Sequence, residues 1–289
     1  MSAALTRIFA IARITFIEMA RLRVFYVLVL FALALVLGSS FLARISFQQE
    51  LQVTEDIALG AVNFFLSLLA ILITAQLLPR DMEDRVIYSV LAKPVTRFEY
   101  MLGKFLGVVA LLSVSAIAMS LLCVAIIHLR EQTAIRETMA QMAQSTPADR
   151  AAALRGVYEA GAMNRLSAAL AAALAKGIIL AALTLCVSSF ATSSVFTISA
   201  MAMIYLVGNL ESVARDYWLH QQVPSVLARA FLAVVTFVFP DLQAFNLTDQ
   251  LFAGAVLSSD LLLRLAGLAA VYTASYLLIA MAFFSQREL

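Results

Sequence analysis

The chain has 289 residues, of which 63% are hydrophobic and only 13% are charged, with a mean hydropathy of +0.95 and a formal net charge of +2. Soluble domains carry roughly 25% charged residues, so this composition excludes an ordinary soluble protein and indicates an integral membrane protein. We expect no nucleic-acid partner.

The N-terminal segment 1–23 predicts a helix that lies along the inner face of the membrane. Its charged residues interrupt any compact apolar core, so no cleavable signal peptide is evident. At 100° per residue, Arg7, Glu18 and Arg21 fall within about 60° of one another, which is typical of an amphipathic interfacial helix. The alternative is a continuous extension of the first span into the cytoplasm.

Six apolar blocks follow, each long enough, or nearly so, to cross a hydrocarbon core that needs about 20 residues. The blocks show no alternating or heptad pattern, so the spans are predicted to be helical. They cover residues 24–42, 57–78, 102–127, 166–190, 195–210 and 261–284. The expected fold class is an all-α membrane protein with one transmembrane domain over 1–289, and both termini on one side.

Basic residues indicate which side that is. Four arginines precede the first span, and five basic residues lie between the second and third spans or at the start of the third, close to the membrane ends where the positive-inside rule applies. We therefore expect both termini and segment 79–101 to be cytoplasmic, in a multi-pass protein of the bacterial cytoplasmic (inner) membrane.

Segment 79–101 predicts a cytoplasmic docking helix. It has an acidic start, then an apolar stripe at i, i+1, i+4, i+5 spacing, and then a lysine and a proline that favour a helix end. A solvated surface helix without a partner is the alternative. We expect the contacts to a partner to come from Asp81, Glu83, Asp84, Arg85, Val86, Ile87, Val90, Leu91, Lys93, Pro94 and Arg97.

Two long segments are predicted on the outer side. Segment 129–165 favours a helical insertion that turns near Ser145 and serves as a platform for an extracytoplasmic partner or a lid, or else as a solvated connector. Segment 211–260 contains an apolar run, 231–239, that is too short to cross and ends at Pro240. This predicts a re-entrant element that caps a pathway, or alternatively an interfacial helix anchored by aromatic side chains.

Lys176 is the only basic residue well inside an apolar block. An ammonium at mid-bilayer costs about 3 kcal/mol on insertion scales, so one interpretation places Lys176 in a pathway, where it contacts an anionic substrate. In the alternative it snorkels to the interface from the end of an outer helix. A metal site is not expected, because no suitable spacing joins the two cysteines to the two histidines.

Several motifs resemble a known family. They are the basic amphipathic entry 14–26, the outer re-entrant element before the last span, and the motifs Leu-x-x-Pro-Val-x-Arg and Leu-Gly-Lys after an acidic start. The matching positions of the acidic start and the two motifs are Glu83, Leu91, Pro94, Val95, Arg97, Leu102, Gly103 and Lys104. The chain resembles membrane subunits of ATP-binding-cassette exporters of the type-2 membrane-domain family, in the branch linked to multicopper enzyme maturation. Where that family usually has Gly-Thr after the acid, this chain has Arg85 and Val86.

The resemblance implies a non-catalytic permease subunit. In such exporters two six-helix subunits, identical or related, form the pathway, and each inserts a coupling helix into a cytoplasmic ATPase, which is present in two copies. ATP and Mg would be bound by that ATPase, with no cofactor in this chain. Consistently, the only Gly-Lys pair, at 103–104, has Phe98 and Phe105 where a phosphate-binding loop needs glycine and a hydroxyl.

Two alternatives stay open. The complex could use ATP to move an extracytoplasmic partner through 129–165 instead of transporting a substrate. An ion-coupled secondary transporter would need intramembrane ionisable residues and paired broken helices, whereas this chain shows only Lys176 and no internal repeat. No motif identifies the substrate, and membrane lipid is the remaining expected partner.

Overall fold

The computed structural model describes residues 2–42, 50–84, 95–141, 163–220, 240–247 and 259–286, and all regular structure in these ranges is helical. The all-α fold class is therefore confirmed. The elements are α1 (Ser2–Ala20), α2 (Arg23–Leu42), α3 (Glu50–Glu83), α5 (Arg97–Gln141), α7 (Met163–Phe190), α8 (Ser194–His220), the short 3-10 helix η2 (Gln243–Phe245) and α11 (Ser259–Gln286).

A helix coincides with each of the six predicted spans. Two of the spans correspond to shorter apolar stretches, Phe25–Leu35 in α2 and Ser194–Leu210 in α8. The four stretches that are long and apolar enough to cross a membrane by themselves are Asp56–Glu83, Arg97–Thr133, Ser167–Phe190 and Asp260–Gln286. The protein is thus a multi-pass membrane protein.

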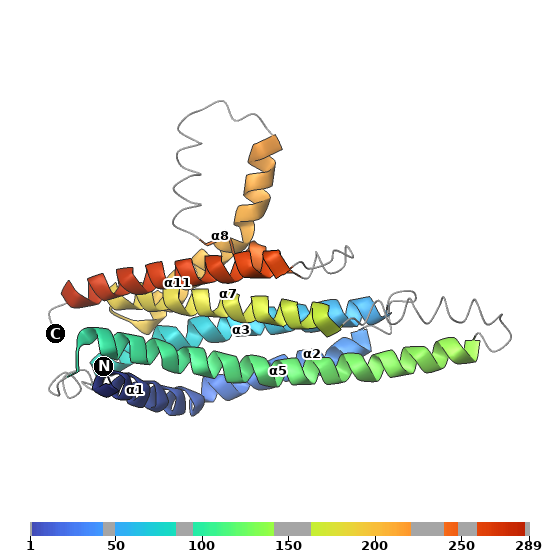
Figure 1. Ribbon diagram of the computed structural model, residues 1–289, viewed down its shortest axis with the longest axis horizontal. Coiled ribbons are helices and arrows are strands. Elements are labelled where there is room, and N and C mark those ends of the chain that lie inside the picture. Colours follow the sequence, from blue (N-terminus) through green and yellow to red (C-terminus); the bar gives the residue numbers. More distant parts are fainter. Residues whose placement is uncertain are drawn as a thin grey trace.

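Five helices lie side by side along one long axis, namely α2, α3, α5, α7 and α11 (Figure 1). Among them α7 is central, because it packs against α3, α5 and α11 and has the largest buried share of the four long spans. Its first half is rich in alanine, and small side chains allow neighbouring helices to approach closely within a membrane. α11 is the least covered of the four long spans.

The start of α1, the end of α3, the start of α5 and the end of α11 all lie at one end of the bundle (Figure 1). We name this end the base. It contains the described ends of segment 79–101. That both termini lie on one side of the membrane, and which side the base faces, stay predictions.

The predicted cytoplasmic segment is divided between two helices. Residues 79–83 form the end of α3, and residues 97–101 form the start of α5. Residues 85–94, which include the apolar stripe, lie outside the described residues. The structure therefore describes the two ends of this segment.

The outer segments also begin as continuations of spans. α5 runs unbroken to Gln141, so residues 129–141 extend the third span. α8 extends to His220, and its last turns rise away from the other helices (Figure 1). The proposed turn at Ser145 and the apolar run 231–239 lie outside the described residues, whereas 240–247 pack inside the bundle, with Leu242, Phe245 and Leu247 buried.

Candidate functional site

The base holds a buried group of polar side chains from three helices. The Nζ atom of Lys104, on α5, lies 2.6 Å from Oδ2 of Asp81 on α3 and 3.6 Å from Oε2 of Glu18 on α1. The hydroxyl of Tyr100 donates a short hydrogen bond to the same oxygen of Asp81. We name Glu18, Asp81, Tyr100 and Lys104 the basal charge cluster.

Most of this cluster is buried, so its charges need partners. Asp81, Tyr100 and Lys104 are only 3%, 1% and 5% exposed, and a buried charge is costly unless it is paired and hydrogen-bonded. Tyr100 and Lys104 are four residues apart, so they lie on one face of α5, and the ammonium lies 5.8 Å from the tyrosine ring centroid. The cluster thus pairs one cation with two carboxylates and one hydroxyl.

A capping box begins α5 and also holds α1. The backbone N–H of Glu99 donates to Thr96 Oγ1 at 3.2 Å, and Glu99 Oε2 accepts the N–H of Thr96 at 3.0 Å. The second carboxylate oxygen, Oε1, accepts a hydrogen bond from Arg7 of α1 at 3.0 Å. One carboxylate therefore closes the helix start and forms an ion pair between helices.

Arg97 connects the same helix start to the last helix. Its Nη1 donates to the carbonyl oxygens of Phe284 and Ser285 at 3.0 and 2.7 Å, which lie in the final turn of α11. Such carbonyls have no partner within the helix, and a cation is favoured there. The ring of Phe284 also stacks on Tyr100, with a centroid distance of 6.0 Å and an interplanar angle of 17°.

α1 packs closely on α5 at two glycines one turn apart. A Cβ atom at Gly103 would lie 2.8 Å from Ile11 Cβ, and one at Gly107 would lie 2.6 Å from Thr15 Cβ. The spacing is that of a G-x-x-x-G helix contact. Two of the three charges on the predicted amphipathic face, Arg7 and Glu18, pair with α5, while Arg21 is exposed.

The predicted coupling residues separate into three groups. Asp81 and Arg97 point into the base and bind other helices of the same chain. Glu83 and Asp84 are exposed, and Asp84 Oδ2 lies 3.7 Å from Nε of Arg80, which is also exposed. The remaining ones, which lie outside the described residues, are Arg85, Val86, Ile87, Val90, Leu91, Lys93 and Pro94.

Sequence reasoning did not identify Glu18, Glu99 and Tyr100 as part of this site, and it noted Lys104 only within the Leu-Gly-Lys motif. The capping box was readable from the spacing of Thr96 and Glu99. The pairs Arg7–Glu99 and Glu18–Lys104 join residues 92 and 86 positions apart, so no local pattern reveals them.

A second polar group surrounds Lys176 within the bundle. Lys176 is 1% exposed, its Nζ lies 3.0 Å from Asn209 Oδ1, and it stands over the ring of Tyr205 at 5.3 Å. Asp241 lies in residues 240–247, which contain η2 and which we name the η2 segment, and its carboxylate attracts the ammonium. This burial between α7 and α8 excludes the snorkelling interpretation in the described structure.

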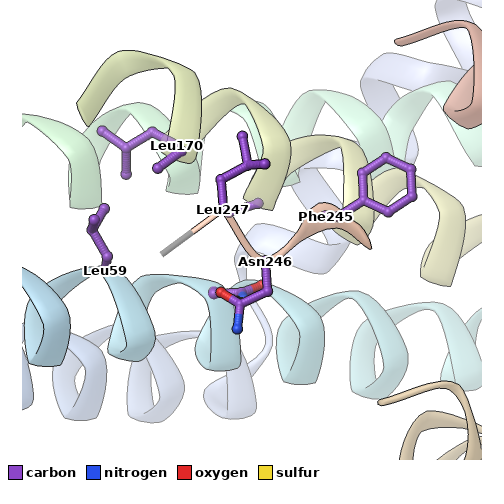
Figure 2. A pocket seen from close by; sticks show the side chains of 8 residues that line it. Leu59, Leu170, Phe245, Asn246 and Leu247 are labelled. Carbon is purple, nitrogen blue, oxygen red and sulfur yellow. Dashed lines mark hydrogen bonds between the residues drawn. The ribbon is translucent and has the colours of Figure 1, made fainter. Parts of the chain in front are cut away.

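A small cavity opens between α3, α7 and the η2 segment (Figure 2). Its volume is about 10 Å³, which is about the space that one water needs. Asn63 Nδ2 lies 3.5 Å from Asn246 Oδ1 beside it, while the Oδ1 atom of Asn63 is buried without a hydrogen-bond partner. On its other side, the backbone N–H of Leu242 donates to the carbonyl oxygen of Gly208 on α8 at 3.2 Å.

Within the described ranges, no three metal-binding side chains gather, and the thiols of Cys123 and Cys186 are buried. The basal charge cluster joins α1, α3 and α5 next to the described ends of the predicted coupling segment.

Comparison with known protein families gives a match. A family model described as ABC-2 family transporter protein matches residues 9–211. This range contains all four residues of the basal charge cluster, and also Lys176. No curated protein matches the chain.

Proposed function

This chain belongs to the ABC-2 family of transporter membrane proteins, and we propose that it is the permease subunit of an exporter that works as a dimer with two copies of a separate ATPase. Segment 79–101 would enter a groove of the ATPase as the coupling helix, and the ATPase would bind ATP and Mg. The branch linked to multicopper enzyme maturation belongs to the same proposal, because it rests on the motifs between Glu83 and Lys104.

One observation carries this proposal. The two helices that lead into and out of residues 85–94 are joined at their ends by the buried ion pair of Asp81 and Lys104. The contacts of Arg7 and Arg97 extend this junction to α1 and α11. A force applied between α3 and α5 would therefore reach four helices, as a coupling element requires.

The predicted coupling residues would have different roles in this proposal. Glu83 and Asp84 are exposed and remain candidates for charge pairing with the ATPase. Asp81 and Arg97 would act indirectly, because their charged groups bind α5 and α11 of this chain. In this proposal the base faces the cytoplasm of a bacterial cell, and both termini are cytoplasmic.

The test is co-purification with the ATPase encoded beside this chain. Changing Val90 and Leu91 together to Asp should remove the ATPase from the detergent-purified complex, because an apolar stripe is the expected anchor in the groove. Leu129→Asp is the matched control, since Leu129 is 67% exposed at the opposite end of α5. If the wild type carries no ATPase, or if the double variant retains it, the coupling-helix assignment fails.

Lys176 is proposed to line the pathway and contact an anionic part of the substrate. The support is its environment, which presents an amide oxygen and an aromatic ring within 5.3 Å of an ammonium that is 1% exposed. Ionisable residues inside a membrane bundle normally mark a pathway or a partner.

A mechanical role is the second candidate, and the length of α5 favours it. This helix has 45 residues and rises about 67 Å at about 1.5 Å per residue, roughly twice a hydrocarbon core of about 30 Å. It begins at the base and continues unbroken beyond the apolar span. Motion at the base would thus be carried to 129–165 and to an extracytoplasmic partner.

A further inference from the structure

We infer that Lys104 is a positioning residue for coupling: it holds α1, α3 and α5 in one arrangement, so that movement of the coupling segment is transmitted to all three helices together. The inference rests on the proposed function. It concerns a residue outside the predicted coupling set, and it assigns to the ammonium a role that needs no contact with the ATPase.

The position of Lys104 between three helices is the first support. Its ammonium is the shared partner of Asp81 from α3 and Glu18 from α1, at 2.6 and 3.6 Å. Tyr100 donates to Asp81 from the other side and stacks on Phe284 of α11. Removal of this cation would take away the shared partner of Asp81 on α3 and Glu18 on α1.

The choice of ionic residues is the second support. Well-packed apolar residues usually stabilise a buried site as well as an ion pair does, whereas ionic groups in some systems select one arrangement among several packings. Three of the four cluster residues are at most 5% exposed, so the cluster bears the full cost of desolvation. Its benefit is a defined geometry at the point where α3 ends and α5 begins.

An exposed ion pair on α11 provides the comparison. Arg264 Nη2 lies 2.9 Å from Asp260 Oδ2, with side chains that are 75% and 70% exposed, and such surface pairs contribute little. Neither residue belongs to the basal charge cluster or to the predicted coupling set. Arg264→Gln with Asp260→Asn therefore controls for the loss of an ion pair away from the base.

The experiment compares variants in the complex with the ATPase, reconstituted in vesicles. Lys104→Met should keep the wild-type ratio of ATPase to permease, because the groove contacts are unchanged, while ATP turnover per complex falls at least fivefold and the KM for ATP stays the same. Lys104→Arg, which keeps a cation beside both Asp81 and Glu18, should retain at least half of the turnover.

Glu18→Gln serves as a second variant in case Lys104→Met folds poorly, since Glu18 is 33% exposed and the pair of α3 with α5 is kept. It should lower turnover at least twofold. Wild-type turnover in both Lys104→Met and Glu18→Gln, or an equal loss in the exposed-pair control, would overturn the inference. Failure of the proposed function looks different, because the wild type itself would then carry no ATPase.

Discussion

Lys104 and Lys176 are both almost completely removed from solvent, but the groups around the two ammonium ions differ. Lys104 has carboxylates at 2.6 and 3.6 Å. Lys176 has the amide oxygen of Asn209 at 3.0 Å and the ring of Tyr205 at 5.3 Å, and Asp241 uses its Oδ1 to accept two backbone N–H groups of the η2 segment. The charge of Lys104 is therefore compensated locally, whereas that of Lys176 has mostly neutral neighbours.

This difference predicts that the same substitution lowers the free energy of unfolding by different amounts at the two sites. Lys176→Met should lower the free energy of unfolding by less than about 1 kcal/mol, because it removes a buried charge whose hydrogen-bond partner is the neutral amide of Asn209. Lys104→Met should cost about 3 kcal/mol, because it leaves the buried carboxylate of Asp81 without its cation. Thermal unfolding of the purified variants measures both values.

The pathway role of Lys176 adds an expectation for activity. ATP turnover in vesicles of native lipid should fall in Lys176→Met even though the protein stays folded and keeps its ATPase. If instead Lys176→Met is destabilised as strongly as Lys104→Met, the lysine serves to join α7 to α8. Unchanged turnover together with unchanged stability would remove the pathway role.

At the level of elements, α1 not only precedes the first span but also packs against α5. Gly103 and Gly107 allow its backbone to lie against α5, and ion pairs from Arg7 and Glu18 join it to the same helix. The exposed face of α1 carries large apolar side chains, among them Leu5 and Phe9. α1 is thereby attached to the helix that follows the coupling segment, although 1–23 precedes that segment by more than 50 residues.

Gly107→Ala should detach α1 or force it to shift. The new Cβ would lie 2.6 Å from Thr15 Cβ and 2.7 Å from the carbonyl oxygen of Ala12, and overpacking of this kind costs about 1–3 kcal/mol. Gly60→Ala is the control, because a Cβ there meets nothing within 4 Å. Thermal unfolding that is equal in both variants would contradict the close packing of α1 on α5.

On the scale of the whole molecule, side chains join four helices at the base, and α5 runs from the base past its apolar span. The described helix ends at the base are joined by side chains of α1, α3, α5 and α11. Toward the other end of the bundle, α5 continues without a break from Leu129 to Gln141. α5 is therefore a continuous route by which a rearrangement at the base would reach that end.

Spin labels can test that route. Labels at Arg136, on the outer part of α5, and at Leu263, which is 72% exposed on α11, should change their separation when ATP binds the complex, if the role is mechanical. Changing Gln132 and Thr133 together to Gly should abolish the change, because two glycines weaken the helix by roughly 2 kcal/mol. A separation that ignores ATP in the wild type would favour transport without a mechanical role.

The sequence alone determined the class of this protein and the place of its spans. Hydrophobicity over about 20 residues is a property of a single helix in lipid, and the helix at each of the six predicted spans shows this. The start of α5 also depends on neighbouring residues alone, because the backbone N–H groups of Thr96 and Glu99 each donate to the other residue's side chain within one turn. Such features need no knowledge of neighbouring helices.

Only the tertiary structure decided which charges stay exposed and which hold the bundle together. Asp81 and Arg97 look like surface charges when they are read along the chain, yet packing places them against Lys104 and the end of α11. Lys176, in turn, lies inside the bundle and not at its edge. The physical reason is that the energy of a charge depends on its partners and on solvent exposure, and helices far apart in the sequence set both.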